Sequence, residues 1–188
     1  TKWDSGQFLM RKIIKSRIEN QVETKLEDSF NNAIKKSIKY LERKDPSLLA
    51  TIMTLPGSSE IECLFEYVNP ISIYKECLDL QLSIGIHLLD DLRILNEKLL
   101  VKVNQPWPKG NGERKLLEKA WFYLALAGDK NVQKNCVESI SHSSMTIARA
   151  ALGALKPLDS SETEESSNLF YDLWKENPVV LDSWFAYE

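Results

Sequence analysis

Two histidines are the first residues whose chemistry could indicate a functional site. His87 is followed one helical turn later by Asp90 and Asp91, and imidazole with carboxylate side chains on one face is a combination that binds zinc. His142 lies 55 residues further on. Neither histidine begins a His-Glu-x-x-His motif, which would place two imidazoles on one helical face. A metal site at His87 therefore stays an alternative to the structural or surface role that we favour.

A hydroxyl nucleophile is the next possibility. Ser141-His142-Ser143-Ser144 sets hydroxyls beside an imidazole, but adjacent residues do not build a triad, which needs a folded geometry and an orienting acid. The sequence has no Gly-x-Ser-x-Gly elbow, and Gly110-Asn111-Gly112 lacks the Lys-Ser/Thr of a phosphate-binding loop. We interpret Ser144 as a helix cap instead.

Cysteine chemistry is not indicated either. The three cysteines form no Cys-x-x-Cys pair and lie among apolar residues, so we interpret each as a small core residue; they are Cys63, Cys77 and Cys136. From the residues alone we assign no catalytic, cofactor-binding or metal-binding residue. A small odd cysteine count and the lack of an Asn-x-Ser/Thr site favour an intracellular, cytoplasmic location.

Helical periodicity dominates the elements that would have to position any such residues. Apolar residues recur at spacings of three and four, and no stretch alternates with period two for long enough to predict a strand. We predict an all-α structure of eight to ten helices, stacked as antiparallel pairs in an α-superhelix of the ARM/HEAT-like solenoid kind. The expected helices cover residues 3–18, 26–41, 46–53, 60–67, 70–103, 116–124, 132–140, 145–155, 161–174 and 178–184.

Start signals support several of these helices. Asp45-Pro46 and Asn69-Pro70 each combine a good N-cap with proline at the first helical position. Residues 159–167 are acidic and serine-rich and could form a linker. We prefer a helix start there, because Ser161-x-x-Glu164 matches a capping box.

Residues 69–103 form the longest periodic stretch, and we expect them to contain the longest helix. Apolar residues lie along one main stripe, with further apolar residues elsewhere around the helix, so this helix should be sandwiched between neighbours. The main stripe is Ile71, Tyr74, Leu78, Leu82, Gly85, Leu89, Leu92 and Leu99, and the further residues are Ile73, Leu80, Ile84 and Leu88. Large anchors elsewhere are expected at Trp121, Trp174 and Trp184.

Charge argues against a dedicated nucleic-acid or membrane binder. The net charge is −3, and no apolar run approaches the ~18–20 residues of a membrane span. Residues 1–44 carry a net +5 and residues 45–188 a net −8. A helical repeat that binds nucleic acid through its basic start is therefore an alternative, although a solvated helix face explains the same charges.

Several ordered stretches together resemble the helical C-terminal domain of aminopeptidase N-type (alanyl aminopeptidase) zinc enzymes. The order and spacing agree over essentially all 188 residues. Ile147, Ser183 and the loop around Trp107 depart from the family pattern. The matching stretches are Trp3-Asp4-Ser5-Gly6-Gln7, residues 45–56 with Glu60-Ile61 and Asn69-Pro70, residues 114–125, Ser144-Met145-Thr146 with Ala150-Ala151-Leu152, Phe170-Tyr171-x-x-Trp174, and Leu181-Asp182-x-Trp184-Phe185.

The resemblance implies that residues 1–188 are one partial helical domain of a peptide hydrolase. In that family a separate domain binds the zinc, and further helices follow, so neither the zinc domain nor the final helices are expected here. The domain's implied role is to wall the active-site cavity and limit entry to short peptides, with the catalytic domain of the same polypeptide as its partner. A stand-alone helical-repeat scaffold for protein interaction remains the alternative function.

Overall fold

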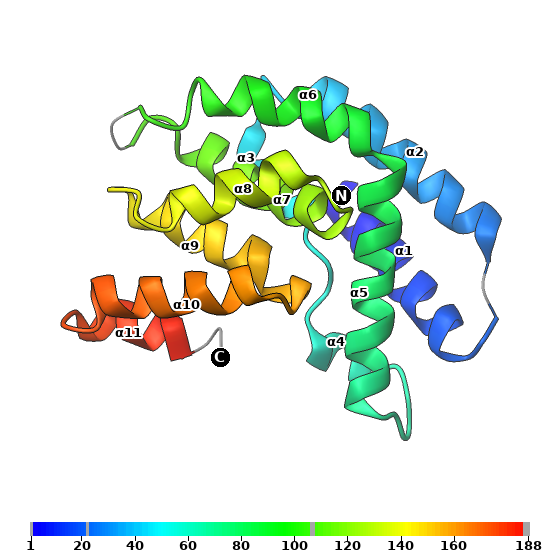
Figure 1. Ribbon diagram of the computed structural model, residues 1–188. Coiled ribbons are helices and arrows are strands. Elements are labelled where there is room, and N and C mark those ends of the chain that lie inside the picture. The colour runs from blue at the N-terminus through cyan, green and yellow to red at the C-terminus, as the bar shows by residue number, and fades with distance from the viewer. Residues whose placement is uncertain (1, 22, 106–107, 186–188) are drawn as a thin grey trace.

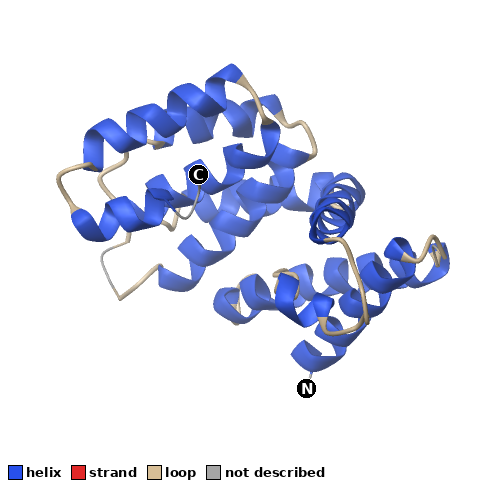
Figure 2. Ribbon diagram, turned by 90° about the horizontal axis from the view of Figure 1, so that it is seen from below, coloured by secondary structure: helices blue, strands red, loops and turns tan. Residues whose placement is uncertain are grey.

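Helices are the regular elements throughout the described residues, which are 2–21, 23–105 and 108–185 of the computed structural model. Figure 2 shows these ranges without a strand, and the predicted all-α class is confirmed. In chain order the elements are α1 (Lys2–Ile18), α2 (Thr24–Leu41), α3 (Pro46–Ile52), α4 (Ser58–Glu62), α5 (Pro70–His87), α6 (Leu89–Leu100), α7 (Asn111–Leu126), α8 (Lys130–Ser139), α9 (Met145–Leu155), the 3-10 turn η1 (Lys156–Leu158), α10 (Ser161–Trp174) and α11 (Pro178–Phe185).

Helix α7 lies at the centre of the stack. In Figure 1 the colour passes from blue α1 and α2 on the right to α10 and α11 at the lower left, although α3 lies against α7 and apart from α4, its neighbour in sequence. Sequential helices pack as pairs, notably α8 with α9 and α10 with α11, while α7 contacts α3, α5, α6, α8 and α9. The predicted stack of helix pairs is confirmed. Among the described residues, no helix is both long and apolar enough to cross a bilayer.

The helix starts follow the predicted chemistry with two corrections. Asp45 accepts from the Leu48 amide and Asn69 from the Ile71 amide, each at 2.9 Å, so both expected caps are confirmed. The capping box predicted to begin at Ser161 is displaced by one residue. Ser160 rather than Ser161 caps α10, and its hydroxyl accepts from the Thr163 amide at 3.3 Å. Ser144 stands at the N-cap of α9, but its side chain makes no capping hydrogen bond.

Two expected helices have different bounds. The helix predicted over 60–67 is only α4, one turn long, and residues 63–68 are turn and bend. The stretch predicted over 70–103 is two helices, because the backbone leaves the helical region at Leu88, with φ −104° and ψ 12°. α5 and α6 then run in different directions in Figure 1. α5 has 18 residues and shares the greatest helix length in the described chain with α2.

The apolar residues predicted on two sides of this stretch differ in their burial. In the main stripe, Gly85 of α5 and Leu92 and Leu99 of α6 are buried, whereas Ile71 and Tyr74 are 75% and 63% exposed. The second set is buried throughout, since the exposed fractions of Ile73, Leu80, Ile84 and Leu88 do not exceed 1%. α5 contacts α1, α4 and α7. The helix also carries an exposed apolar stripe that ends at Ile86, which is 59% exposed.

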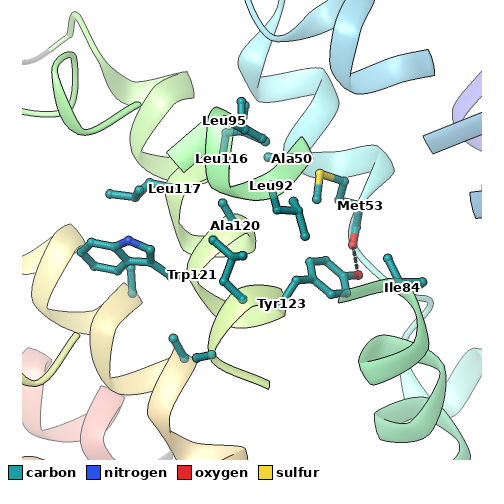
Figure 3. Packing of buried hydrophobic residues seen from close by; sticks show 14 of the residues in the cluster. Ala50, Met53, Ile84, Leu92, Leu95, Leu116, Leu117, Ala120, Trp121 and Tyr123 are labelled. Atoms are coloured by element: carbon teal, nitrogen blue, oxygen red, sulfur yellow. Dashed lines mark hydrogen bonds between the residues drawn. The ribbon is translucent and has the colours of Figure 1, made fainter. Parts of the chain in front are cut away.

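α7 presents its two largest core side chains in opposite directions, as Figure 3 shows. The Trp121 indole N–H donates to Asn96 Oδ1 at 2.9 Å, and the Tyr123 hydroxyl donates to the Met53 carbonyl at 2.6 Å. Both aromatic residues are 1% exposed. Buried polar atoms that find partners in this way cost little desolvation energy. α7 is therefore fixed to α6 on one side and to the end of α3 on the other.

The other two expected tryptophan anchors are only partly buried. Trp184 donates its indole N–H to Ser167, at 3.0 Å to the hydroxyl and 3.2 Å to the carbonyl, which links α11 to α10. The Trp174 indole nitrogen is buried without a hydrogen-bond partner among the described residues. Trp121 is thus the stronger anchor of the three.

A buried guanidinium closes the loop between α6 and α7. Arg114 is 8% exposed and donates to the carbonyls of Val103, Gln105 and Lys109 at 3.0, 3.0 and 3.2 Å. A cation near the C-terminal carbonyls of a helix is favoured by the helix dipole. The neighbouring Gly110 has φ +72°, and a Cβ there would lie 3.0 Å from Arg114 Nη1, so glycine is required on both grounds. α7 begins at Asn111, five residues before the expected start at Leu116, and residues 106–107 lie outside the described residues.

Asp129 joins α6 to the start of α8. Its carboxylate accepts from the Asn131 and Val132 amides at 3.1 Å and from Arg93 Nε at 2.7 Å. Burial alone would raise the pKa of Asp129. The Arg93 hydrogen bond and charge and the two amides outweigh burial, so the pKa lies below its ordinary value.

We expect acid to remove the contribution of this carboxylate. A lowered pKa in the folded state means that the stabilisation is present above the unfolded pKa, about 3.9, and is lost as the pH falls through the folded pKa. Asp129→Ala, which removes cap and charge, should lower the unfolding free energy by about 1–2 kcal/mol near neutral pH. Asp129→Asn keeps a capping oxygen, so its difference from wild type measures the contribution of the negative charge alone. Urea unfolding at several pH values should show the Asn variant approaching wild type below about pH 4. An equal difference at all pH values would contradict this.

Candidate functional site

The candidate site is a groove formed by two adjoining hollows of about 230 and 420 Å³, which we call the 54–57 groove. Both hollows are lined by Thr54, Leu55, Glu118 and Lys119. The groove lies where α1, α5 and α7 approach the segment that connects α3 to α4. Its other lining residues that bear on the argument are Trp3, Gln7, Pro56, Gly57, Glu60, Gln81, Lys115 and Phe122.

The connecting segment is held from both sides at its start. The Tyr123 hydroxyl binds the Met53 carbonyl, and burial raises the pKa of Tyr123, so the hydroxyl remains a donor at neutral pH. Gln7 is only 5% exposed, and its Nε2 donates to the Thr54 carbonyl at 2.9 Å. Pro56 cannot continue a helix. The chain therefore crosses the groove as a non-helical segment at residues 55–57 before α4 begins.

Charges in the groove are mostly paired. Glu60 accepts from Arg11 at 2.9 Å, and Lys119 donates to Glu118 at 3.0 Å. Lys115 is exposed and has no carboxylate partner among the described residues. Phe122 and Leu55 add apolar surface. This arrangement can bind a ligand that has polar main-chain groups and some apolar surface, but it places no nucleophile beside a base.

The residues first considered for chemistry do not come together. His87 is exposed at the end of α5. Asp91 pairs with Lys35 at 2.9 Å, and Asp90 lies 3.7 Å from Arg93. Among the described residues, no group of three His, Cys, Asp or Glu side chains could hold a metal ion. They therefore offer no fit to the zinc that the resemblance implies for the parent enzyme.

The serine–histidine run forms a turn. His142 Nδ1 accepts a hydrogen bond from the Ser144 amide at 2.9 Å. This imidazole nitrogen is therefore not free to accept a proton from a serine hydroxyl. The cap predicted for the Ser144 side chain is replaced by this backbone contact. His142 thus stabilises the entry into α9.

The cysteines divide into two environments. Burial raises the pKa of Cys136 to about 12, and burial together with Glu76 raises that of Cys77 to about 11, so both thiols stay protonated at neutral pH. The expectation of a core cysteine is wrong for Cys63, which is exposed just after α4 ends, because the helix predicted there is too short to bury it.

Comparison with known proteins identifies the family to which this fold belongs. The family model described as a domain of unknown function (DUF3458_C) with ARM repeats matches residues 1–188. The chain belongs to this family.

Two curated relatives carry the name aminopeptidase N. The Caulobacter vibrioides protein is 24% identical over 189 residues and the Escherichia coli protein 25% identical over 194 residues, each covering 98% of this chain. A crystal structure of Legionella pneumophila aminopeptidase A in complex with aspartic acid matches with a TM-score of 0.76 and 16% identity over 98% of the chain. The chain spans only 22–23% of the length of these proteins. The predicted resemblance to an aminopeptidase N-type C-terminal domain is confirmed.

Sequence reasoning missed the groove of this ARM-repeat domain. Its parts come from segments far apart in the chain, and only packing brings Gln81 of α5 beside residues 54–57. One signal was available on α7. Lys115, Glu118, Lys119 and Phe122 recur at spacings of three and four, so a charged and aromatic face interrupts an otherwise apolar helix.

Proposed function

We propose that this ARM-repeat domain is the non-catalytic helical part of a zinc aminopeptidase that removes N-terminal residues from peptides. The observation that carries the proposal is the match of nearly the whole chain to proteins named aminopeptidase N. In this proposal the zinc is held by another domain of the same polypeptide. The stacked helices act by shape, forming one wall of the active-site cavity and limiting entry to short peptides.

A wall of this kind would serve the chemistry indirectly. Excluding water from a cavity strengthens electrostatic interactions inside it. A rigid wall also limits which chains reach the reacting atoms, and here rigidity comes from α7, which is fixed on two sides by Trp121 and Tyr123. The three free cysteines support a reducing intracellular compartment, the cytoplasm.

Two measurements test the proposal. The full-length protein should hydrolyse an alanyl chromogenic substrate in a zinc-dependent way, whereas the 188-residue chain should neither hydrolyse it nor hold one zinc per chain, because catalytic zinc needs three protein ligands. The kcat/KM of the full-length protein should also fall as peptides lengthen. One zinc bound tightly by the isolated chain, together with turnover, would refute the non-catalytic role. A kcat/KM that is independent of peptide length would refute the access filter.

A stand-alone scaffold for protein interaction is the second candidate. The observation that favours it is the exposed apolar stripe of α5, since large exposed apolar surfaces mark interaction sites. The reading frame separates the two functions. A His-Glu-x-x-His motif upstream in the same frame supports the aminopeptidase, and a start codon immediately before Thr1 supports the scaffold.

A further inference from the structure

The segment at the floor of the 54–57 groove has main-chain groups that the protein leaves free. No described residue hydrogen-bonds to the amide or carbonyl of Leu55 or to the amide of Gly57. The two preceding carbonyls, of Met53 and Thr54, are both taken by side chains of the groove wall. The free groups thus begin where the fixed part of the segment ends, and they lie beside a hollow rather than within a helix.

The local sequence suits pairing with another chain. Gly57 has φ −64° and ψ 153°, the polyproline II region, in which the backbone makes no hydrogen bonds within the segment. The carbonyl of Gly57 already accepts from the Glu60 and Ile61 amides at 3.0 and 3.3 Å. The groups left for another chain are therefore the amide and carbonyl of Leu55 and the amide of Gly57, and Pro56 between them has no N–H to offer.

The side chains around these free main-chain groups define the ligand further. With Glu60 paired to Arg11 and Glu118 to Lys119, the groove is left with the unpaired ammonium of Lys115 among its described charges. Leu55 and the Trp3 indole, which is 42% exposed, offer apolar contacts. An extended peptide with a free C-terminal carboxylate satisfies all three features, because its main chain, apolar side chains and negative end each find a partner.

We propose that the 54–57 groove is a peptide-binding site that takes a short extended peptide by its main chain and its C-terminal carboxylate. This rests on the proposed function, which makes short peptides the molecules that the parent handles. The free main-chain groups of Leu55 and Gly57 pair with the peptide main chain, and Lys115 meets the carboxylate. Because Gln7 and Tyr123 already fix the segment, binding does not have to order it.

The binding probe is a hexapeptide of alternating Ala and Leu, capped at its N-terminus with fluorescein and free at its C-terminus. The cap removes the free amine that an aminopeptidase needs, so the probe is not consumed. Fluorescence anisotropy with the full-length protein reports its affinity. We expect Gly57→Pro to weaken binding roughly 2- to 10-fold, the range that one hydrogen bond is worth. The backbone of Gly57 already has a proline-like φ, and its amide has no partner to lose.

Gly57→Ala is the matched control, since it keeps the amide and its Cβ meets nothing closer than 3.9 Å. It should bind the probe as wild type does. Lys115→Glu should weaken the free-acid probe severalfold and the C-terminally amidated probe less, whereas Lys36→Glu on the exposed side of α2 should change neither. Equal binding by the proline and alanine variants, or equal effects at positions 115 and 36, would overturn the proposal.

Failure of the proposed function is visible separately. Alanyl chromogenic hydrolysis by the wild-type protein reports the parent activity without the probe. Activity with no variant-dependent binding rejects the peptide groove alone. Variant-dependent binding without activity upholds the groove and rejects the aminopeptidase.

Discussion

Trp121→Ala should lower the free energy of unfolding of the 188-residue chain by about 3–5 kcal/mol, the usual cost of truncating a large buried aromatic residue. The indole is 1% exposed, so its removal leaves a cavity beside α7, the helix that packs against α3, α5, α6, α8 and α9. The change also leaves Asn96 Oδ1 without its hydrogen-bond donor, and because Asn96 is only 7% exposed, water cannot readily replace that donor. A loss of this size is a large share of the stability of a domain.

Urea unfolding followed by circular dichroism measures this loss. Trp121→Phe is the matched control, because it keeps an aromatic ring and removes only the indole donor and part of the volume. Trp121→Phe should lower the unfolding free energy by less than Trp121→Ala does, and the difference between the two variants measures the cost of the cavity. A loss below about 1 kcal/mol for Trp121→Ala would show that α7 is not the central support inferred here.

Gly85→Ala should also destabilise the chain, although alanine is the better helix former by about 1 kcal/mol. A Cβ at Gly85 would lie 2.6 Å from the Tyr123 carbonyl oxygen and 3.3 Å from Ala127 Cβ, so α5 and α7 cross too closely for a methyl group. The obstacle is backbone, which cannot rotate aside. Separating the helices costs typically 1–3 kcal/mol, which exceeds the gain in helix propensity.

Gly6→Ala on α1 is the control for helix propensity, because a Cβ there meets nothing within 4 Å. It should be neutral or stabilising by about 0.5–1 kcal/mol. In thermal unfolding beside wild type, Gly85→Ala should therefore lower the midpoint, and Gly6→Ala should leave it unchanged or raise it. Equal midpoints for Gly85→Ala and wild type would show that the crossing is looser than the structure has it.

Local chemistry was enough to predict much of the fold. Proline and asparagine or aspartate signals placed the starts of α3 and α5, and the clear 3.6-residue period placed α2. α5 was harder because it is apolar on two sides. Periodicity alone cannot tell which side meets α7, and the deciding contact is the close approach at Gly85, which depends on another helix.

The candidate site was less accessible to sequence reasoning than the fold. Its floor is the segment between α3 and α4, and the site depends on main-chain groups of that segment that tertiary packing leaves free. Neither a hydrogen bond that is not made nor the approach of Gln81 to Thr54 has a signature in residue types. The carboxylates near His87 pair with Lys35 and Arg93, which agrees with the structural or surface role favoured from the sequence.

The Arg114 contacts bear on how this domain tolerates change. One guanidinium gathers carbonyls from both ends of the connection between α6 and α7, so the register of the two helices is fixed below the loop rather than by it. The planar fork of the guanidinium reaches three carbonyls at once, which the single ammonium of a lysine would not reproduce. This position therefore does not tolerate the exchange of one basic residue for the other.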